Sequence, residues 1–178
     1  MATGTIILWP GPLTLPDGTT NNLFCQAQVV KSTGTEPTNA PDVYFTELLF
    51  DGTSDEHALF TFVLPGDYAS GGTVVIHWKR ASGTGAANVV WKSAIAAITP
   101  GGTEVPNSKI FNTVSTATTA AGTTSQALQT TSITPASDSA AAEDMITVMV
   151  GRDADNASDT LNAVDAQVTG VYFTYTTT

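Results

Sequence analysis

Hydrophobic and polar residues alternate with a period of two along much of this chain. In residues 57–64, for example, Ala58, Phe60, Phe62 and Leu64 fall on one side of an extended backbone. Such alternation is typical of a β-strand with one buried face, and no long window keeps the spacing of an amphipathic helix. The pattern predicts about ten short strands. They lie at residues 5–9, 23–30, 43–50, 57–64, 73–80, 89–95, 110–115, 126–133, 146–150 and 171–175.

Turn clusters rich in Gly, Pro, Asn and Asp separate most of these strands, as in "PDGTTNN" and "PGDYASGG". Such short connections leave no room for crossover helices, so the predicted fold class is all-β, an antiparallel sandwich or barrel in a single domain. Residues 41–178 are predicted to form the sandwich. Residues 1–40, which contain four prolines, are predicted to form an extended N-terminal arm with the first strands. The Thr-, Ser- and Ala-rich residues 112–144 are predicted to hold two lightly apolar strands.

Two of the three tryptophans, Trp78 and Trp91, lie symmetrically about Thr84 and Gly85. If that pair is a hairpin tip, the two indoles face each other across neighbouring strands. The same strand faces carry Val74, Ile76, Val89 and Ile95, all aliphatic, whereas a sugar-binding platform surrounds its aromatic residues with polar groups. We therefore assign the tryptophans to the core. The predicted core residues are Trp78, Trp91, Phe60, Phe62 and Phe173.

Composition narrows the possible partners. The chain has 178 residues, a formal charge of −10 and only 12% charged residues. An acidic chain without a basic cluster is a poor ligand for nucleic acid. Its apolar runs are too short to span a bilayer, and the N-terminus lacks the features of a secretion signal. The lone Cys25 cannot form an internal disulfide and is interpreted as a small buried residue that suits a reducing cytoplasm.

The densest carboxylate cluster follows Arg152 and contains Asp153, Asp155 and Asp159. Calcium prefers six or more oxygen ligands from such a loop, but the spacing does not match an EF-hand. A solvated loop is the default interpretation, with Arg152 pairing one aspartate, and calcium is the alternative. The sequence therefore predicts no cofactor and no metal.

Catalytic motifs are not found. His57 and His77 are predicted on outward faces, without a third ligand at short spacing that would suit zinc. Glu47 shares a face with Val43, Phe45 and Leu49, but the opposite face is equally apolar and is expected to point inward, leaving Glu47 outside. No second carboxylate is predicted beside it, so we expect no enzymatic activity.

Two stretches are similar to a pattern in small virion proteins of tailed bacteriophages. The first is "FDGTSDEHALFTFVLPGDYASGGTVVIHWKRASGTGAANVVWK", with Pro65 and Tyr68 in a turn before the two tryptophan strands. The second is the closing "VMVGRDADNASDTLNAVDAQVTGVYFTYT". The resemblance implies a jelly-roll head decoration, or cement, protein. Such a protein is typically a homotrimer that binds the major capsid protein on the capsid exterior.

The N-terminal arm is the predicted interface, because a proline-rich segment can reach a neighbouring subunit. Its candidate contact residues are Trp9, Pro10, Pro12 and Pro16. The alternative function is a lectin-like jelly roll on the virion surface. It would bind host glycans through exposed aromatic residues such as Tyr68 or Trp9 and a calcium-loaded aspartate loop. A polysaccharide-degrading enzyme is a third possibility, for which no convergent catalytic set is found.

Overall fold

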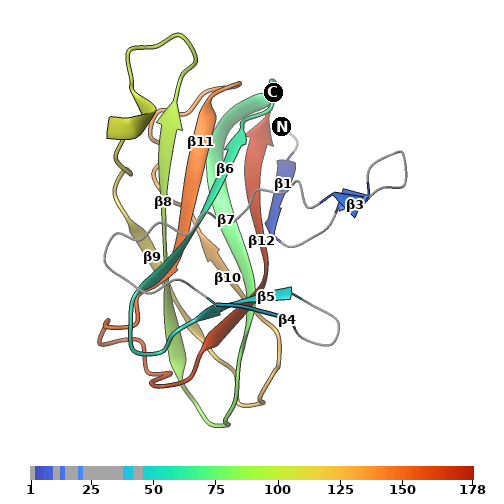
Figure 1. Ribbon diagram of the computed structural model, residues 1–178, viewed down its shortest axis with the longest axis vertical. Coiled ribbons are helices and arrows are strands. Elements are labelled where there is room, and N and C mark those ends of the chain that lie inside the picture. Colours follow the sequence, from blue (N-terminus) through green and yellow to red (C-terminus); the bar gives the residue numbers. More distant parts are fainter. Residues whose placement is uncertain (1–2, 10–12, 15–19, 22–37, 42–45) are drawn as a thin grey trace.

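Two antiparallel β-sheets pack face to face in this protein (Figure 1). The computed structural model describes residues 3–9, 13–14, 20–21, 38–41 and 46–178. Within them the strands are β1 Thr3–Trp9, β2 Leu13–Thr14, β3 Thr20–Asn21, β4 Thr38–Pro41, β5 Thr46–Phe50, β6 Glu56–Val63, β7 Tyr68–Arg80, β8 Asn88–Ile98, β9 Ser115–Ala120, β10 Gln129–Ile133, β11 Met145–Arg152 and β12 Ala166–Thr177. One short 3₁₀ turn, η1, spans Pro106–Ser108. The predicted all-β antiparallel sandwich is confirmed.

The larger sheet has six strands, of which five follow the order β10-β7-β12-β5-β4. The sixth strand, β1, lies on the same side of β12 as β5. β1 pairs with residues 171–176 of β12, and β5 pairs with residues 166–168. The smaller sheet has four strands in the order β6-β11-β8-β9. β2 and β3 form a separate two-stranded sheet. The N-terminal strand β1 lies in the main sheet, so this part of the predicted arm belongs to the sandwich.

The eight strands from β5 to β12 pair like one long hairpin that has been rolled up. β8 pairs with β9, β7 with β10, β6 with β11 and β5 with β12. Two further ladders, β7 with β12 and β8 with β11, join these pairs into the two sheets. The rolled strand order brings residues more than a hundred positions apart side by side.

The tryptophan pair lies at the centre of the core between the sheets. Trp78 and Trp91 are both 0% exposed, and their ring centroids are 5.6 Å apart in an edge-to-face arrangement. Phe50 packs edge-on against Trp91. Phe60 and Phe173 are also buried in this core, and Phe62 packs partly buried at its border. The predicted core residues therefore line the interior.

The predicted tryptophan hairpin is wrong, because β7 and β8 belong to opposite sheets. The indoles meet across the sandwich rather than across neighbouring strands of one sheet. The connection at residues 81–87 has seven residues and passes from one sheet to the other. Alternation places a side chain on a face of its own strand, but it does not say which strand lies alongside.

The Thr-rich segment holds two strands, β9 and β10, which close one side of the sandwich. Thr131 is buried, and its hydroxyl accepts a hydrogen bond from Trp78 Nε1 (2.9 Å) and donates one to Thr119 (2.8 Å). Threonine hydroxyls therefore supply hydrogen-bond partners where β9 and β10 meet the core, which explains why these strands carry few apolar residues.

The strand predicted at residues 110–115 is not found, since β9 begins only at Ser115. Phe111 instead packs outside the smaller sheet on Leu59, Ala94 and Met149, and the Asn112 amide donates to the Ile95 carbonyl. The apolar residues that suggested a strand cover this outer patch. Within the described part of the chain, no helix is long and apolar enough to cross a membrane.

Candidate functional site: the two loop ends of the sandwich

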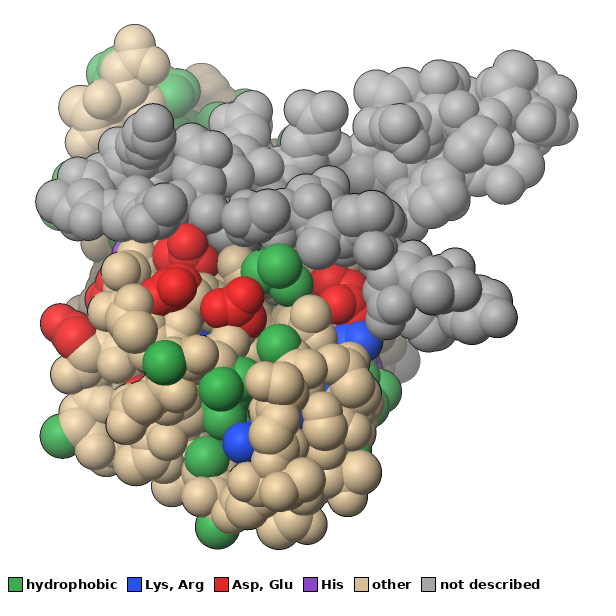
Figure 2. All heavy atoms as spheres, turned by 60° about the horizontal axis from the view of Figure 1, so that its bottom comes forward, with side chains coloured by type: hydrophobic (Ala, Val, Ile, Leu, Met, Phe, Trp, Pro, Cys, Tyr) green, Lys and Arg blue, Asp and Glu red, His purple; other side chains and the backbone are tan. Residues whose placement is uncertain are grey.

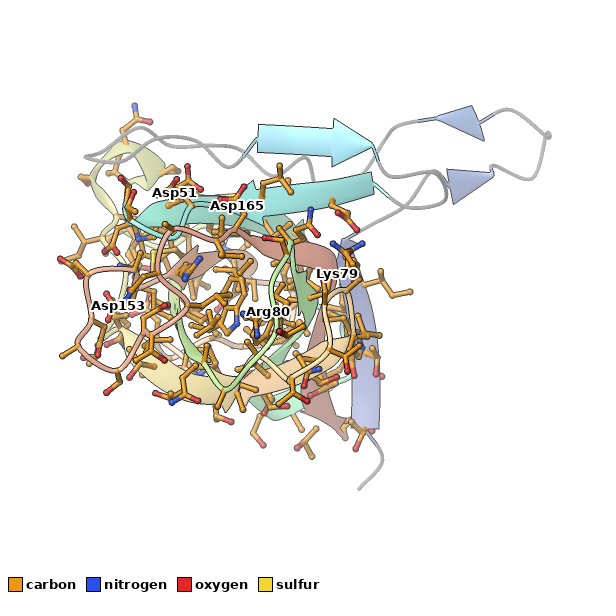
Figure 3. The ribbon with its side chains drawn as sticks, turned by 90° about the horizontal axis from the view of Figure 1, so that it is seen from below. Asp51, Lys79, Arg80, Asp153 and Asp165 are labelled. Carbon is orange, nitrogen blue, oxygen red and sulfur yellow. The ribbon has the colours of Figure 1, made fainter. Side chains whose placement is uncertain are left out.

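Charged residues gather at the lower loop end, which we define as residues 51–55, 81–87, 121–128 and 153–165. Figure 2 shows carboxylates clustered on the surface there, and Figure 3 shows Asp51, Asp153 and Asp165 from below. Arg80 joins two of these loops, since its guanidinium donates to the carbonyls of Gly85 (2.8 Å) and Gly122 (3.0 Å). The end of the sandwich is thus tied together by charged side chains.

A buried ion pair between Arg152 and Asp159 anchors the 153–165 loop. Both side chains are 0% exposed, and Arg152 donates from Nε (2.9 Å) and Nη2 (2.8 Å) to the two carboxylate oxygens. The remaining donors reach the carbonyls of Phe50, Val164 and Leu161. The predicted pairing of Arg152 with an aspartate is confirmed. Because Asp159 faces inward, it is not available as a ligand in the calcium loop that the sequence left as an alternative.

The other two aspartates of that loop do come together, with a partner that sequence reasoning missed. Asp55, Asp153 and Asp155 place carboxylate oxygens within 4.8 Å of one another. Lys92 extends from β8 to ion-pair with Asp55 and with Asp153 (3.1 Å). Asp55 lies about a hundred residues from the others, so no local spacing could reveal it.

The chemistry of this cluster suits an internal ion-pair network better than a calcium centre. Burial opposes ionisation of Asp153, yet hydrogen bonds from Asn156 and Lys92 together hold its pKa below the usual value. One Asp55 oxygen also accepts the Ala154 amide (2.8 Å). Calcium needs six or more oxygens. Here an ammonium group already occupies the space between two carboxylates.

The second carboxyl group cluster consists of Asp51, Glu56 and Asp165. Glu56 is only 4% exposed, and its Oε2 accepts the Asp51 amide (2.7 Å). Burial, with the nearby charges of Asp51 and Asp165 adding to it, raises the pKa of Glu56 to about 7. Burial and the Asp51 charge also raise the pKa of Asp165. The charge of Arg152 opposes the rise at Glu56, but Arg152 is hydrogen-bonded to Asp159, and no ion pair to Glu56 is found among the described residues.

The burial of Glu47 differs from the sequence prediction. Leu48 and Phe50 point into the core as predicted, which places Glu47 on the opposite side, but its side chain is 2% exposed rather than solvated. Lys79 Nζ lies 2.6 Å from Glu47 Oε1. A buried carboxylate next to an ammonium group is stabilised as an ion pair, which gives Glu47 a structural role rather than a catalytic one.

The two histidines lie in different sheets. His57, in β6, is half-buried, and burial together with the Lys92 charge lowers its pKa. His77, in β7, contacts the Thr130 hydroxyl (3.0 Å) and packs on the Tyr172 ring. Because they face outward from opposite sheets, they cannot ligate one metal ion together.

Of the two aromatic residues predicted for glycan binding, only the Tyr68 side chain is described, and it is buried. Tyr68 is 5% exposed rather than exposed as expected, and its hydroxyl donates to the Gly71 carbonyl (2.7 Å). The other candidate, Trp9, ends β1, and its side chain lies outside the description. Pro10, Pro12 and Pro16 also lie outside the described residues.

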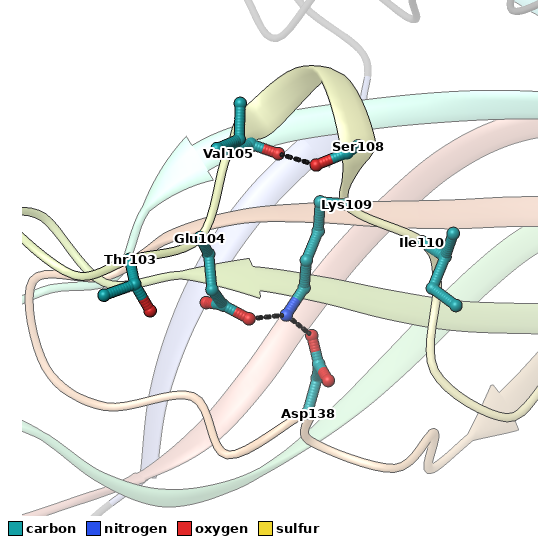
Figure 4. A pocket seen from close by; sticks show the side chains of 7 residues that line it. All are labelled: Thr103, Glu104, Val105, Ser108, Lys109, Ile110 and Asp138. Carbon is teal, nitrogen blue, oxygen red and sulfur yellow. Dashed lines mark hydrogen bonds and ion pairs between the residues drawn. The ribbon is translucent and has the colours of Figure 1, made fainter.

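The upper loop, residues 99–111, projects from the opposite end of the sandwich between β8 and β9 (Figure 1). Lys109 fixes its base by ion pairs with Glu104 (2.5 Å) and Asp138 (2.9 Å), drawn in Figure 4. Asp138 also accepts the Ala97 amide (2.8 Å). These side chains line an open hollow of about 320 Å³ with Thr103, Val105, Ser108 and Ile110.

Two apolar side chains stand exposed on this loop. Val105 is 56% and Ile110 is 80% exposed. Isolated apolar residues are common on protein surfaces. These two, however, lie on a projecting loop that is tied to the sandwich by the ion pair between the Lys109 side chain and Asp138.

Comparison with models of known protein families finds no match. Comparison with curated proteins finds none either.

Proposed function

We propose that this protein is a structural virion protein that decorates the assembled capsid shell of a tailed bacteriophage and stabilises it from outside. The sequence motifs suggest this function through their resemblance to decoration proteins, and the shape of the upper loop supports it. A projecting loop with exposed Val105 and Ile110 and a braced base is suited to insert into a hollow on a partner protein.

The strand order supports the jelly-roll form of the proposal. A jelly roll is a long hairpin of eight strands rolled into two sheets, and strands β5 to β12 follow that pairing. This fold alone does not specify a function, since it serves in capsid proteins, lectins and enzymes.

The distribution of charge supports a protein partner over nucleic acid. Each lysine and arginine that the structure describes has an acidic or carbonyl partner within the chain. These residues are Lys79, Arg80, Lys92, Lys109 and Arg152. Binding to a phosphate backbone depends on cations that are available to it.

Co-sedimentation with assembled capsid shells tests the proposal. We expect the protein to pellet with shells in a saturable manner. Replacing Val105 and Ile110 with Asp should weaken shell binding about tenfold or more, because two charges would have to be desolvated in the contact. Thermal unfolding should be almost unchanged, since both side chains are exposed.

The matched control replaces Thr116 and Thr118 with Asp, which adds the same two charges to exposed positions of β9. This control should bind shells like the unmodified protein. Failure of the unmodified protein to pellet with any shell would contradict the proposed function. Equal binding by both double variants would instead exclude the upper loop as the contact.

A further inference from the structure

We propose that β1 is an association edge, on which β1 of a second copy of this chain pairs antiparallel across a two-fold axis. The larger sheets of the two copies would then join into one continuous sheet. This inference concerns self-association and does not depend on the proposed binding to a shell.

The outer side of β1 has no partner strand among the described residues. β1 pairs with β12 from Thr3 opposite Thr176 to Trp9 opposite Val171, and no other described strand pairs with it. In an antiparallel ladder, alternate residues direct their N–H and C=O groups away from the partner strand. β1, which lies at the side of the molecule in Figures 1 and 3, therefore has backbone donors and acceptors directed away from β12.

The sequence of β1 lacks the features that usually protect such an edge. Natural edge strands are blunted by lysine, proline, inward charges or short length. β1 reads "TGTIILW", with seven residues, no charge and no proline, and its one irregularity falls at the Ile7–Trp9 end. By contrast, the edge strand β4 ends in Pro41 and the edge strand β6 begins with Glu56 and His57. The uncharged edge strands β9 and β10 contact each other where the two sheets meet, through the hydroxyls of Thr119 and Thr131. Among the edges of the two sheets, β1 is therefore the one suited to accept another strand.

Packing fixes β1 in position. Leu8 is buried in the core and Ile6 packs against it, while Ile7 points outward and is 70% exposed. The Tyr175 ring covers Gly4 so closely that an added Cβ would lie 2.1 Å from a ring carbon. The edge is therefore ordered before a partner arrives, which reduces the entropy lost on pairing.

The surroundings of β1 explain why a like-charged second copy can approach. Each copy carries a charge of −10, so contact between acidic surfaces would be repulsive. The neighbouring outer face of the sheet is uncharged. One row of side chains across it consists of threonines, namely Thr5, Thr174, Thr73 and Thr134. The next row contains Ile7, Tyr172, Val75 and Ser132.

A two-fold axis follows from the identity of the two strands. An antiparallel pair of identical strands uses the same donors and acceptors twice, which makes the contact isologous and self-limiting. The resemblance to decoration proteins implies a trimer, whereas pairing through β1 gives a dimer.

Light scattering coupled to size exclusion tests the pairing with two matched variants. Thr5→Lys places a lysine on β1, and a lysine on an edge strand opposes pairing with another strand. Thr118→Lys makes the same change on an exposed position of β9. We expect the unmodified chain and Thr118→Lys to have a mass near twice 18.4 kDa, and Thr5→Lys to have a mass near 18.4 kDa.

Amide hydrogen exchange over a dilution series provides an independent measurement, also if Thr5→Lys folds poorly. Alternate amides of β1 should lose protection as the protein is diluted, while amides of β12 should stay protected. A monomer at every concentration, a trimer, or a dimer that survives Thr5→Lys with unchanged β1 exchange would each overturn the inference. Shell co-sedimentation is scored separately, so failure of β1 pairing leaves the proposed function testable by itself.

Discussion

Arg152 shows how one side chain can hold a loop end together. Its guanidinium donates hydrogen bonds to both oxygens of Asp159 and to three backbone carbonyls, so that each of its three nitrogen atoms is satisfied in a buried site. The sequence predicted that Arg152 would pair with an aspartate. It did not identify Asp159, because several aspartates in one loop are equivalent until the fold decides which of them faces inward.

Replacing Arg152 with Leu should lower the free energy of unfolding by about 3–5 kcal/mol, because Asp159 would remain buried without its cation. Urea denaturation measures the change. The double variant with Asp159→Leu should recover part of the loss. Lys109→Ala, which removes a more exposed ion pair, should cost no more than about 1 kcal/mol. A loss for Arg152→Leu as small as that of Lys109→Ala would contradict this account.

Glu56 should make stability depend on pH. Its pKa is about 7 in the folded protein against 4.5 as the ordinary value, so the folded state holds the proton more tightly than the unfolded state. The stabilising contribution is complete below pH 4.5 and is lost as pH rises through about 7.

Glu56→Gln keeps the side chain neutral and should remove this dependence. We expect the variant to be more stable than the unmodified protein at pH 8 and similar to it near pH 4.5, as measured by urea unfolding across that range. Glu143→Gln, at an exposed position, is the matched control. A constant difference between Glu56→Gln and the unmodified protein at all pH values would count against a raised pKa.

At the level of elements, the upper loop depends on a residue from a distant connection. Asp138 lies between β10 and β11, yet it bonds Lys109 in the loop and the Ala97 amide in β8. The sequence predicted turns in this region, but it also predicted a strand at residues 110–115. Apolar alternation cannot distinguish a paired strand from a segment such as Phe111 that lies over a sheet.

Asp138→Ala should release the upper loop without unfolding the sandwich. We expect faster hydrogen exchange for amides of residues 97–112 and weaker binding to shells, with only a small fall in melting temperature. Thr103→Ala, which alters the lining of the same hollow, should leave the exchange of these amides unchanged. Exchange in Asp138→Ala that matches the unmodified protein would show that the loop is held by other contacts.

At the level of the whole molecule, the sequence predicted the class of fold but not the strand pairing. Local alternation identified most strands and the core residues, because burial of one face is a local property. The assignment of β7 and β8 to opposite sheets and the meeting of Asp55 with Asp153 depend on contacts across the chain. Those contacts are set by the rolled strand order, which no short window contains.

The pairing of Thr3 with Thr176 places the two ends of the chain next to each other, at the same end of the sandwich as the upper loop (Figure 1). A peptide or enzyme fused to either end would therefore emerge at the same end of the sandwich as the upper loop and could limit the access of a partner to that loop. A circular permutant that joins residues 3 and 177 by a linker and opens the chain at residues 81–87 would carry the same cargo at the opposite end. For display on a shell, the permuted chain is the better starting scaffold.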